Sequence, residues 1–334
     1  MNEKNIDSYN MRQIILDFPR QFPVGYGAVG DAGKEFTSKE FKNIIIAGMG
    51  GSALAGEVLT LLSGALKLQL PVFIHRDYGL SSMANKNSLI VTLSYSGNTE
   101  ETLSVYQAAK EKGITLAVIT SDGSLKQMAK KDKKPLAIVP EGIPPRLAIG
   151  YQFSALLAIL SNVGIIEPKE DVVQKISSEL KSAEVMSLAK ELVGEIKEKT
   201  PIIYSSKANS PLAYIMKIQI NENAKRHAFY NSFPELNHNE ILGYENSNPD
   251  NFFVFMLRDK NDHPKNQRRM EITARLLEKR KYKVKFIDIE GENMYNRAFN
   301  AILFGTWLSY YLAIQDSIDP TPVTLIKEIK RSLS

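Results

Sequence analysis

The sequence contains no cysteine. Disulfide bonds, thiolate zinc sites, iron–sulfur clusters and a cysteine nucleophile are therefore all excluded. Histidine is scarce as well, and no two histidines form the His-x-x-x-His pair that zinc enzymes carry on a helix, which disfavours a zinc enzyme. The four histidines are His75, His227, His238 and His263.

Long hydrophobic runs are also missing. No stretch approaches the ~18 consecutive apolar residues that a membrane-spanning helix needs. The opening residues, MNEKNIDSYNMRQ, lack the apolar core of a signal peptide. We therefore expect a soluble, cytoplasmic protein that has no membrane partner.

Neither sign of charge is in large excess. Lys and Arg total 42, Asp and Glu total 37, and the formal net charge is +5 over 334 residues. Because acidic residues are interspersed with basic ones nearly everywhere, we expect no nucleic-acid partner. The chain is 43% hydrophobic and 24% charged, as in ordinary globular proteins, and its length predicts roughly two domains.

From residue 43 the chain alternates short apolar runs with helix-like segments. The runs are rich in β-branched residues, and their hydrophobicity is continuous rather than alternating. Such runs are typical of strands buried on both faces of a parallel sheet. They cover residues 43–48, 71–75, 88–94, 114–120 and 135–140, and later 201–206, 251–257 and 282–289. The alternation predicts an α/β fold with right-handed crossovers.

The two halves of the chain open alike. IIIAGMGGSALA begins the first and IIYSSKANSPLA the second, and each pattern indicates a strand, a turn of small residues and a helix. We predict two similar α/β subdomains, each a mainly parallel sheet between layers of helices. The predicted segments are an N-terminal helical segment (1–24), a first subdomain (25–160), a helical linker (161–199) and a second subdomain with a C-terminal helical tail (200–334).

The first candidate site is GMGGSA at residues 48–53, directly after a predicted strand. It fits the loose dinucleotide pattern G-x-G-x-x-A, a weak signal by itself, so a nicotinamide enzyme is one alternative. The acidic residue that would bind the ribose is Asp77, and the neighbouring Arg76 makes that role ambiguous. The simpler interpretation is a tight strand-to-helix turn that needs glycine for close packing.

The second candidate site is SYSGNTEE at residues 94–101, also after a predicted strand. Its hydroxyls, together with the unpaired amides of a following helix, would suit a single anion, most naturally a phosphate. Capping by Asn98 or Thr99, with Glu100 and Glu101 in the first turn, explains one or two of the polar residues. Capping does not explain the whole cluster, so we favour a phosphate site.

These two loops resemble the sugar isomerase (SIS) domain. Three further stretches narrow the resemblance: QINENAK at 219–225, PELNHNE at 234–240 and DPTPV at 319–323. Together they look like the bifunctional phosphoglucose/phosphomannose isomerases, over nearly the whole chain from about residue 25. The resemblance implies two SIS subdomains and a homodimer, which agrees with the similarity of the two halves.

The resemblance also implies roles for individual residues. Glu222 would be the proton-transferring base, Arg146 would lie near the reacting carbons, and His238 would assist ring opening in the partner subunit's active site. A lysine near the C-terminus completes the set; Lys330 matches best, and Lys327 is the alternative. The implied phosphate-binding residues are Gly50, Gly51, Ser52, Ser94, Ser96 and Thr99.

These residue types suit an aldose–ketose isomerisation. One carboxylate can move a proton between C1 and C2 of an open-chain sugar phosphate, first as base and then as acid. An arginine supplies permanent positive charge to the enediolate, and a histidine titrates near neutrality, as ring opening requires. No metal or organic cofactor is expected. In this family a threonine near the C-terminus makes room for the mannose epimer, and Thr321 and Thr324 are both candidates.

Other functions compete with the isomerase. A non-catalytic SIS regulator would bind sugar phosphates at the same loops, but the roughly 25 residues before the first subdomain are too few for a helix-turn-helix segment. A nicotinamide-dependent dehydrogenase would use the glycine-rich loop for its cofactor. An aminotransferring SIS enzyme would need a glutaminase domain with a cysteine nucleophile, which the sequence lacks. We therefore expect an isomerase whose substrates are sugar 6-phosphates.

Overall fold

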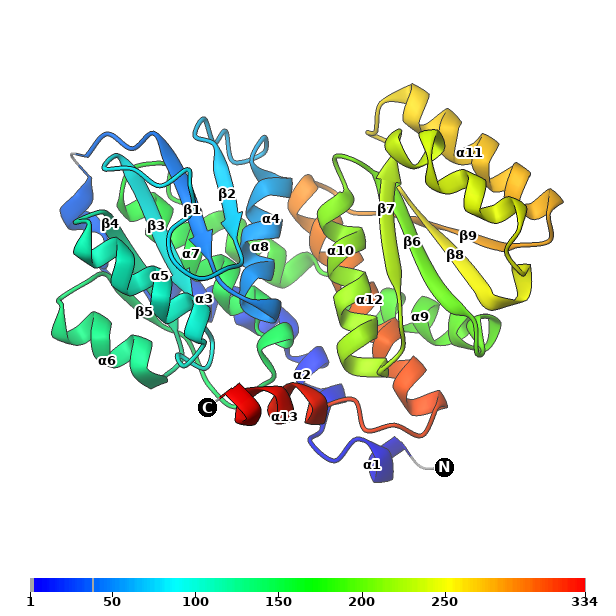
Figure 1. The fold of residues 1–334 in the computed structure, drawn as a ribbon, viewed down its shortest axis with the longest axis horizontal. Helices are drawn as coiled ribbons and strands as arrows, with labels where there is room; N and C mark the ends of the chain where they lie inside the picture. The colour runs from blue at the N-terminus through cyan, green and yellow to red at the C-terminus, as the bar shows by residue number, and fades with distance from the viewer. Residues whose placement is uncertain (1–2, 38, 334) are drawn as a thin grey trace. The chain divides into compact units, whose positions relative to one another are not determined.

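The computed structural model describes residues 3–37 and 39–333, which form two compact units (Figure 1). The first unit is Asp17–Leu180, and the second unit combines Met1–Leu16 with Lys181–Ser334. The chain thus passes between units inside the predicted N-terminal helical segment and again inside the predicted linker. The four predicted segments differ from this division, and their boundaries stay a prediction.

The first unit is built on five parallel strands in the order β2-β1-β3-β4-β5. The strands are β1 (Asn43–Ala47), β2 (Val72–His75), β3 (Ser88–Leu93), β4 (Thr115–Thr120) and β5 (Leu136–Ile138). Every residue of β1, β3 and β4 is buried. This burial on both faces explains the continuous hydrophobicity of their sequences.

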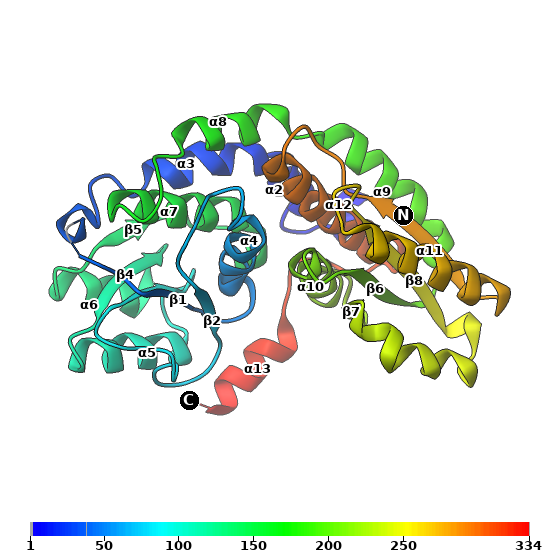
Figure 2. The ribbon, with the colours of Figure 1, turned by 90° about the horizontal axis from the view of Figure 1, so that it is seen from above.

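Helices cover both faces of the first sheet (Figure 2). They are α3 (Gln21–Gly27), α4 (Leu54–Leu62), α5 (Glu100–Glu111), α6 (Gly123–Lys131), α7 (Ile149–Asn162) and α8 (Glu170–Glu179). On one face, Val105 and Tyr106 of α5 pack in a cluster with Ile45 of β1. The next residue, Ile46, points to the opposite face, where Gly56 of α4 lies against it.

The second unit repeats this plan with four parallel strands in the order β7-β6-β8-β9. The strands are β6 (Thr200–Ser206), β7 (Phe229–Phe233), β8 (Phe252–Arg258) and β9 (Lys283–Asp288). When the strands of each unit are numbered in chain order, this order matches the first four strands of the first sheet, β2-β1-β3-β4. Two parallel α/β units therefore confirm the predicted fold class and the similarity of the halves.

The helices of the second unit include both ends of the described chain. They are α1 (Glu3–Ile6), α2 (Met11–Leu16), α9 (Ser182–Ile196), α10 (Ser210–Gln219), α11 (Pro264–Lys279), α12 (Met294–Gln315) and α13 (Thr324–Leu333). On one face of the sheet, Met270 and Leu277 of α11 pack with Tyr204. On the other face α12 is buried almost all round, and Trp307 is fully enclosed. Burying one such large apolar side chain contributes ~1.5–3 kcal/mol.

The eight strands expected from the sequence are all present, and one strand was missed. β7 escaped prediction because Asn231 and Ser232 interrupt its apolar pattern. Among residues 3–37 and 39–333, no helix combines the length and the apolar character that crossing a membrane requires.

The buried tyrosines generate a prediction about alkaline stability. Burial raises the pKa of Tyr95 to about 12 and also raises the pKa values of Tyr106, Tyr204, Tyr244 and Tyr310 above 10.0. A raised pKa means that the folded state keeps a proton that the unfolded chain loses. The protonated tyrosines therefore make their full contribution to the free energy of unfolding below pH 10.0. This contribution is lost as the pH rises toward their pKa values in the folded state.

We expect these five tyrosines to ionise only as the protein unfolds. Tyrosinate absorbance and far-ultraviolet circular dichroism, recorded together through an alkaline titration, check this. Full tyrosinate absorbance from a chain that keeps its native circular dichroism would contradict it.

Candidate functional site

Two loops meet at the carboxyl edge of the first sheet. β1 and β3 are neighbours, and the helices that follow them, α4 and α5, pack on opposite faces. Such a change of direction is the topological switch point at which open α/β sheets bind ligands. The loops after β1 and β3 carry all six predicted phosphate-binding residues, so the fold brings these residues to one edge.

The loop after β1 forms a short 3-10 turn, Gly50–Ala53, before α4 begins. Ser52 is buried, and its Oγ accepts a hydrogen bond of 3.0 Å from the backbone N–H of Tyr95 in the second loop. A Cβ on Gly48 would come 2.8 Å from the carbonyl oxygen of Leu93. Glycine at this position therefore allows the two loops to touch.

The loop after β3 holds its hydroxyls at the start of α5. Ser94 donates to Thr99 Oγ1 at 2.9 Å, while Ser96 is exposed. Thr99 occupies the N-cap position yet makes no side-chain capping hydrogen bond within the described chain. The Asn98 side chain is turned away, accepting from the Ser124 N–H at 2.9 Å. The capping interpretation therefore fails to account for this loop, and the α5 N-terminus adds partial positive charge to it.

Arg146 reaches the same edge from a third segment. It lies in the 3-10 turn Pro145–Leu147, is 2% exposed, and its backbone N would be only 2.5 Å from a Cβ on Gly51. The turn thus packs directly on the loop after β1. Arg146 is buried, and its guanidinium carries a charge that does not titrate in the physiological range.

Tyr95 is a residue of this edge that sequence reasoning missed. Its hydroxyl donates to the Pro140 carbonyl at 2.7 Å and accepts from the Ile143 N–H at 3.4 Å. Its own carbonyl accepts from Ser121 Oγ at 2.6 Å. Tyr95 therefore ties the serine-rich loop to the segment that leads to Arg146. The only sequence signal is an aromatic residue inside a run of small polar ones.

Glu222 lies in the second unit, on a π-helical turn, Ile220–Ala224, that follows α10. Its side chain is partly exposed, whereas Asn223 is fully buried. Lys225, the next residue after the turn, has φ +56° and donates through Nζ to the Glu222 carbonyl. The turn is thus a distinct, well-anchored local structure rather than the end of a regular helix.

His238 ends a 3-10 helix, Glu235–His238, that follows β7, and its side chain is exposed. α10 starts at the carboxyl end of β6 and leads back to the amino end of β7 (Figure 1). Glu222 and His238 therefore lie at opposite edges of the second sheet. The second unit does not bring these two predicted residues together.

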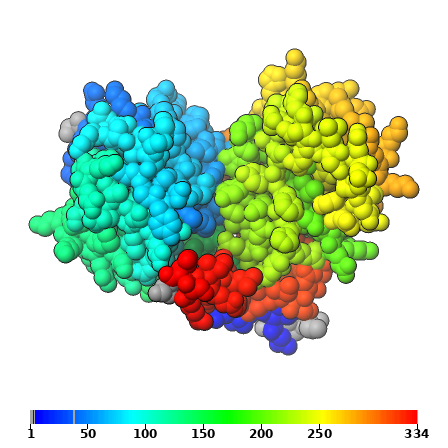
Figure 3. Space-filling model, in the orientation of Figure 1, coloured from blue at the N-terminus to red at the C-terminus, as the bar shows by residue number. Residues whose placement is uncertain are grey.

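The remaining predicted residues belong to the C-terminal tail. Lys327 and Lys330 lie on α13, which has no buried residue and is the red surface helix of Figure 3. Thr324 begins this helix and is exposed. Thr321 is partly buried and donates through its N–H to Asp319 Oδ1 at 3.0 Å. Of the two candidate threonines, Thr321 is the one held in a defined contact.

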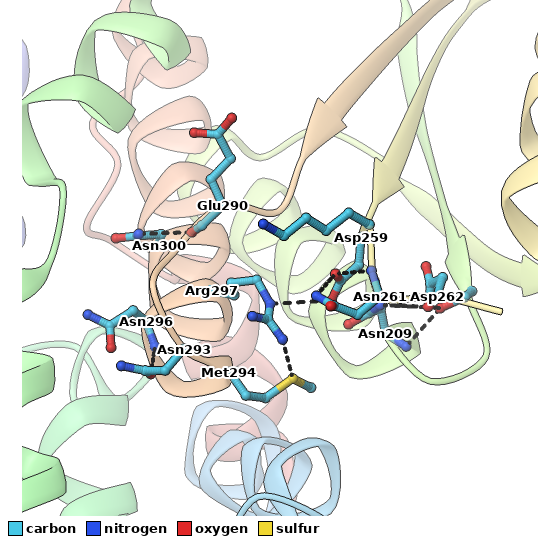
Figure 4. Close-up of polar contacts among 12 residues, drawn as sticks. Asn209, Asp259, Asn261, Asp262, Glu290, Asn293, Met294, Asn296, Arg297 and Asn300 are labelled. Atoms are coloured by element: carbon cyan, nitrogen blue, oxygen red, sulfur yellow. Dashed lines mark hydrogen bonds and ion pairs between the residues drawn. The ribbon is translucent and has the colours of Figure 1, made fainter. Parts of the chain in front are cut away.

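The second sheet has a switch point of its own, between β6 and β8, but its chemistry is acidic (Figure 4). Asp262 Oδ1 accepts from Ser206 Oγ at 2.5 Å and from Asn209 Nδ2 at 3.1 Å. Arg297 Nε lies 3.5 Å from Asp259 Oδ2. Burial raises the pKa of Asp262. A buried carboxylate thus occupies the place that an anion would take, so this edge does not resemble a phosphate site.

Among the described residues, no three His, Asp or Glu side chains are grouped so that they could hold a metal ion. The predicted residues are divided between the two units, and only those of the first unit meet at one sheet edge. The first unit holds Gly50, Gly51, Ser52, Ser94, Ser96, Thr99 and Arg146. The second unit holds Glu222, His238 and Lys330.

Comparisons with known families match both halves of the chain. Residues 25–161 match the model of the SIS domain. Residues 186–333 match the model of the bacterial phospho-glucose isomerase C-terminal SIS domain. The two matches together account for most of the chain.

Similar proteins extend over nearly the full length. The bifunctional phosphoglucose/phosphomannose isomerase of Caldicellulosiruptor bescii is 37% identical over 338 residues, covering 97% of this chain and 99% of that protein. Its counterpart in Aquifex aeolicus is 33% identical, covering 91% and 93%. The solved C-terminal domain of glucosamine-fructose-6-phosphate aminotransferase from Francisella tularensis is 14% identical with a TM-score of 0.72, covering 94% and 97%. That last likeness concerns the fold.

The contact between Gly51 and Arg146 predicts that a single methyl group disrupts anion binding. In Gly51→Ala the new Cβ clashes with the backbone of the Pro145–Leu147 turn, so the loop after β1 must shift and take the Gly51 amide out of position for an anion. Losing one hydrogen bond to a charged group costs ~1.5–3 kcal/mol. We therefore expect the Kd for inorganic phosphate, measured by calorimetry, to rise at least about tenfold.

Gly27→Ala is the matched control, because the position that its methyl group would take, at the end of α3, has no atom within 4 Å beyond its own helix and chain neighbours. It should bind phosphate as the unchanged protein does. Equal phosphate affinity in Gly51→Ala and Gly27→Ala would contradict the assigned geometry.

Proposed function

Since the chain belongs to the family of bifunctional phosphoglucose/phosphomannose isomerases, we propose that it interconverts glucose 6-phosphate and fructose 6-phosphate, and mannose 6-phosphate and fructose 6-phosphate. One structural observation supports this proposal independently of family membership. The serine-rich loop, the uncapped start of α5 and the buried Arg146 lie at one sheet edge. Hydroxyls, helix amides and a guanidinium are what a sugar phosphate requires.

In the proposed reaction the phosphate is held by Ser52, Ser94, Ser96 and Thr99, with backbone amides of Gly50 and Gly51. Ring opening exposes the carbonyl of the linear sugar. Glu222 then removes the proton from one of the two reacting carbons and returns it to the other. The intermediate is a cis-enediolate, whose negative charge the permanent cation of Arg146 stabilises. We assign Lys330 as the C-terminal lysine that completes this set of residues, with Lys327 as the alternative.

The mannose reaction requires room for the opposite configuration at C2, and we assign this role to Thr321 rather than Thr324. Pro320, the residue before Thr321, accepts a 2.9 Å hydrogen bond from Lys225 Nζ. Lys225 also donates to the carbonyl of Glu222. Thr321 is thus connected to the turn that carries the proposed base, whereas Thr324 is an exposed residue of α13.

We further propose a homodimer in which His238 serves the partner subunit. Two observations support this: His238 is exposed, and it lies at the sheet edge opposite Glu222 within the second unit. An exposed imidazole can enter a second copy's site, where it would open the sugar ring. We also propose that the protein works in the cytoplasm, in glycolysis and gluconeogenesis.

The base assignment predicts the behaviour of Glu222→Gln. The amide keeps the shape of the side chain but cannot accept a proton from carbon, and losing a general base costs ~10²–10⁴-fold in rate. We expect kcat with fructose 6-phosphate to fall by that factor while KM changes little. A variant that keeps more than a tenth of the original kcat would remove Glu222 from this role.

The same assay separates the isomerase from its competitors. Formation of glucose 6-phosphate and mannose 6-phosphate without added nucleotide supports the proposal. A reaction that proceeds only with NAD or NADP would instead identify a dehydrogenase, and binding without turnover would identify a regulator.

A shared site predicts complementation between two inactive variants. Homodimers of Glu222→Gln and of His238→Ala each lack one group in every site. A mixed dimer has one site with both defects and one site with neither. Since random exchange makes half of the dimers mixed, activity should recover to about a quarter of the original value.

The measurement is initial rate after mixing, with subunit exchange followed independently through a size tag on one variant. No recovery in a sample that has exchanged would show that His238 acts within its own chain or not at all.

A further inference from the structure

The proposed base stands on an unusual piece of backbone. α10 ends at Gln219, and the π-helical turn Ile220–Ala224 follows without a break. A π turn replaces the regular i→i−4 hydrogen bonds of the helix with wider ones, and such turns often occur at functional sites. The direction in which a side chain of this turn points therefore depends on the contacts that fix the turn in place.

Two buried amides hold this turn to α12. Gln219 Nε2 donates to Thr306 Oγ1 at 2.7 Å and to the Ile302 carbonyl at 3.2 Å. Asn223 Nδ2 donates to Ser309 Oγ at 2.9 Å. Gln219 is 1% exposed and Asn223 is 0% exposed. One of these amides thus lies three residues before Glu222 in the chain, and the other directly follows it.

The face of α12 is shaped for these amides. Thr306 and Ser309 are three residues apart and so lie on one face of the helix, and Ser309 Oγ donates back to the Thr306 carbonyl at 2.9 Å. A Cβ on Gly305 would come 2.4 Å from Gln219 Oε1. Glycine at that position therefore lets the Gln219 amide lie against the helix.

Apolar packing alone would leave the turn free to slide or rotate, whereas hydrogen bonds fix both distance and direction. Burying polar groups is costly, so two amide nitrogens paired with two hydroxyls at this contact indicate a requirement for defined geometry. From these contacts we infer that Gln219 and Asn223, held by Thr306 and Ser309, are positioning residues for the Glu222 carboxylate. The inference rests on the proposed function, in which Glu222 transfers the proton.

The expected consequence is a loss in kcat with little change in KM. A general base must lie within hydrogen-bond reach of the proton that it removes, and a displacement of about 1 Å costs roughly 10²-fold in rate. Substrate binding at the phosphate loops does not depend on this contact. Thr306→Val keeps the shape of the side chain but removes the nearer of the two acceptors of Gln219 and leaves the Ile302 carbonyl. Ser309→Ala removes the hydroxyl that accepts from Asn223.

The experiment measures kcat and KM with fructose 6-phosphate for Thr306→Val, Ser309→Ala and the double variant. We expect kcat to fall roughly tenfold in each single variant and roughly 10²-fold in the double variant, with KM within about threefold. Thr306→Ser restores the hydroxyl and should recover kcat to within about threefold, because it keeps the acceptor for Gln219.

The chain offers matched controls in its first unit. Thr102 and Ser154 are buried, and their hydroxyls make no hydrogen bond within the described part of the chain. Thr102→Val and Ser154→Ala therefore delete the same groups from a core without touching the turn. Both should keep kcat within about twofold. Melting temperatures of all variants show whether a fall in kcat follows a general loss of stability.

Unchanged kcat in both Thr306→Val and Ser309→Ala overturns the inference, and so does an equal fall in kcat in the matched controls. Ser309→Ala is the smaller change and provides the same test where Thr306→Val fails to fold. Failure of the proposed function looks different: the unchanged protein would not isomerise fructose 6-phosphate, or Glu222→Gln would remain active. An active protein, an inactive Glu222→Gln and a fully active double variant would reject the positioning role alone.

Discussion

Close approach of four backbone segments at the carboxyl edge of the first sheet is the constraint on which the proposed phosphate site depends. A Cβ on Gly51 would lie 2.5 Å from the Arg146 backbone N, and one on Gly97 would lie 1.7 Å from the Asp122 carbonyl oxygen. Gly97 also has φ +70°, where residues with a Cβ are strained. Backbone contacts and the hydrogen bonds of Tyr95 hold these segments together. Ser96 is exposed at this edge, and Thr99 is partly exposed.

The two units show how one topology can carry opposite chemistry. Their strand orders correspond, yet the first unit places serines and an arginine at its switch point, and the second places Asp259 and Asp262 there. Because a carboxylate repels a phosphate, the second edge cannot duplicate the first. The second unit instead carries the proposed base at the far end of α10, at its opposite edge. Under the proposal, two units of the same topology therefore carry different chemical roles.

The sequence predicts local features of this protein better than those that arise from tertiary contacts. Strands such as β1 and β3 were predictable because burial on both faces demands an uninterrupted apolar run. β7 was not, since its exposed residues, Phe229 and Tyr230, and its polar centre give no such run. The loop after β3 was predicted to bind phosphate from its hydroxyls and from the helix expected to follow it, and this role stays a prediction. Glu222 was identified only through the family resemblance. The contacts of its π turn with Thr306 and Ser309 join residues more than eighty positions apart and leave no local sequence pattern.

The proposed arrangement makes catalysis depend on assembly as well as on fold. Each chain holds the proposed phosphate loops and Arg146 in one unit and Glu222 in the other. Every group proposed for proton transfer therefore occurs once in each chain. His238 is exposed at the edge opposite Glu222, and in the proposal it completes the site of a second copy. A monomer would then bind the sugar phosphate but would depend on spontaneous ring opening for its linear substrate. Dilution below the dimer's dissociation constant would therefore lower the rate through ring opening, while leaving the phosphate site intact.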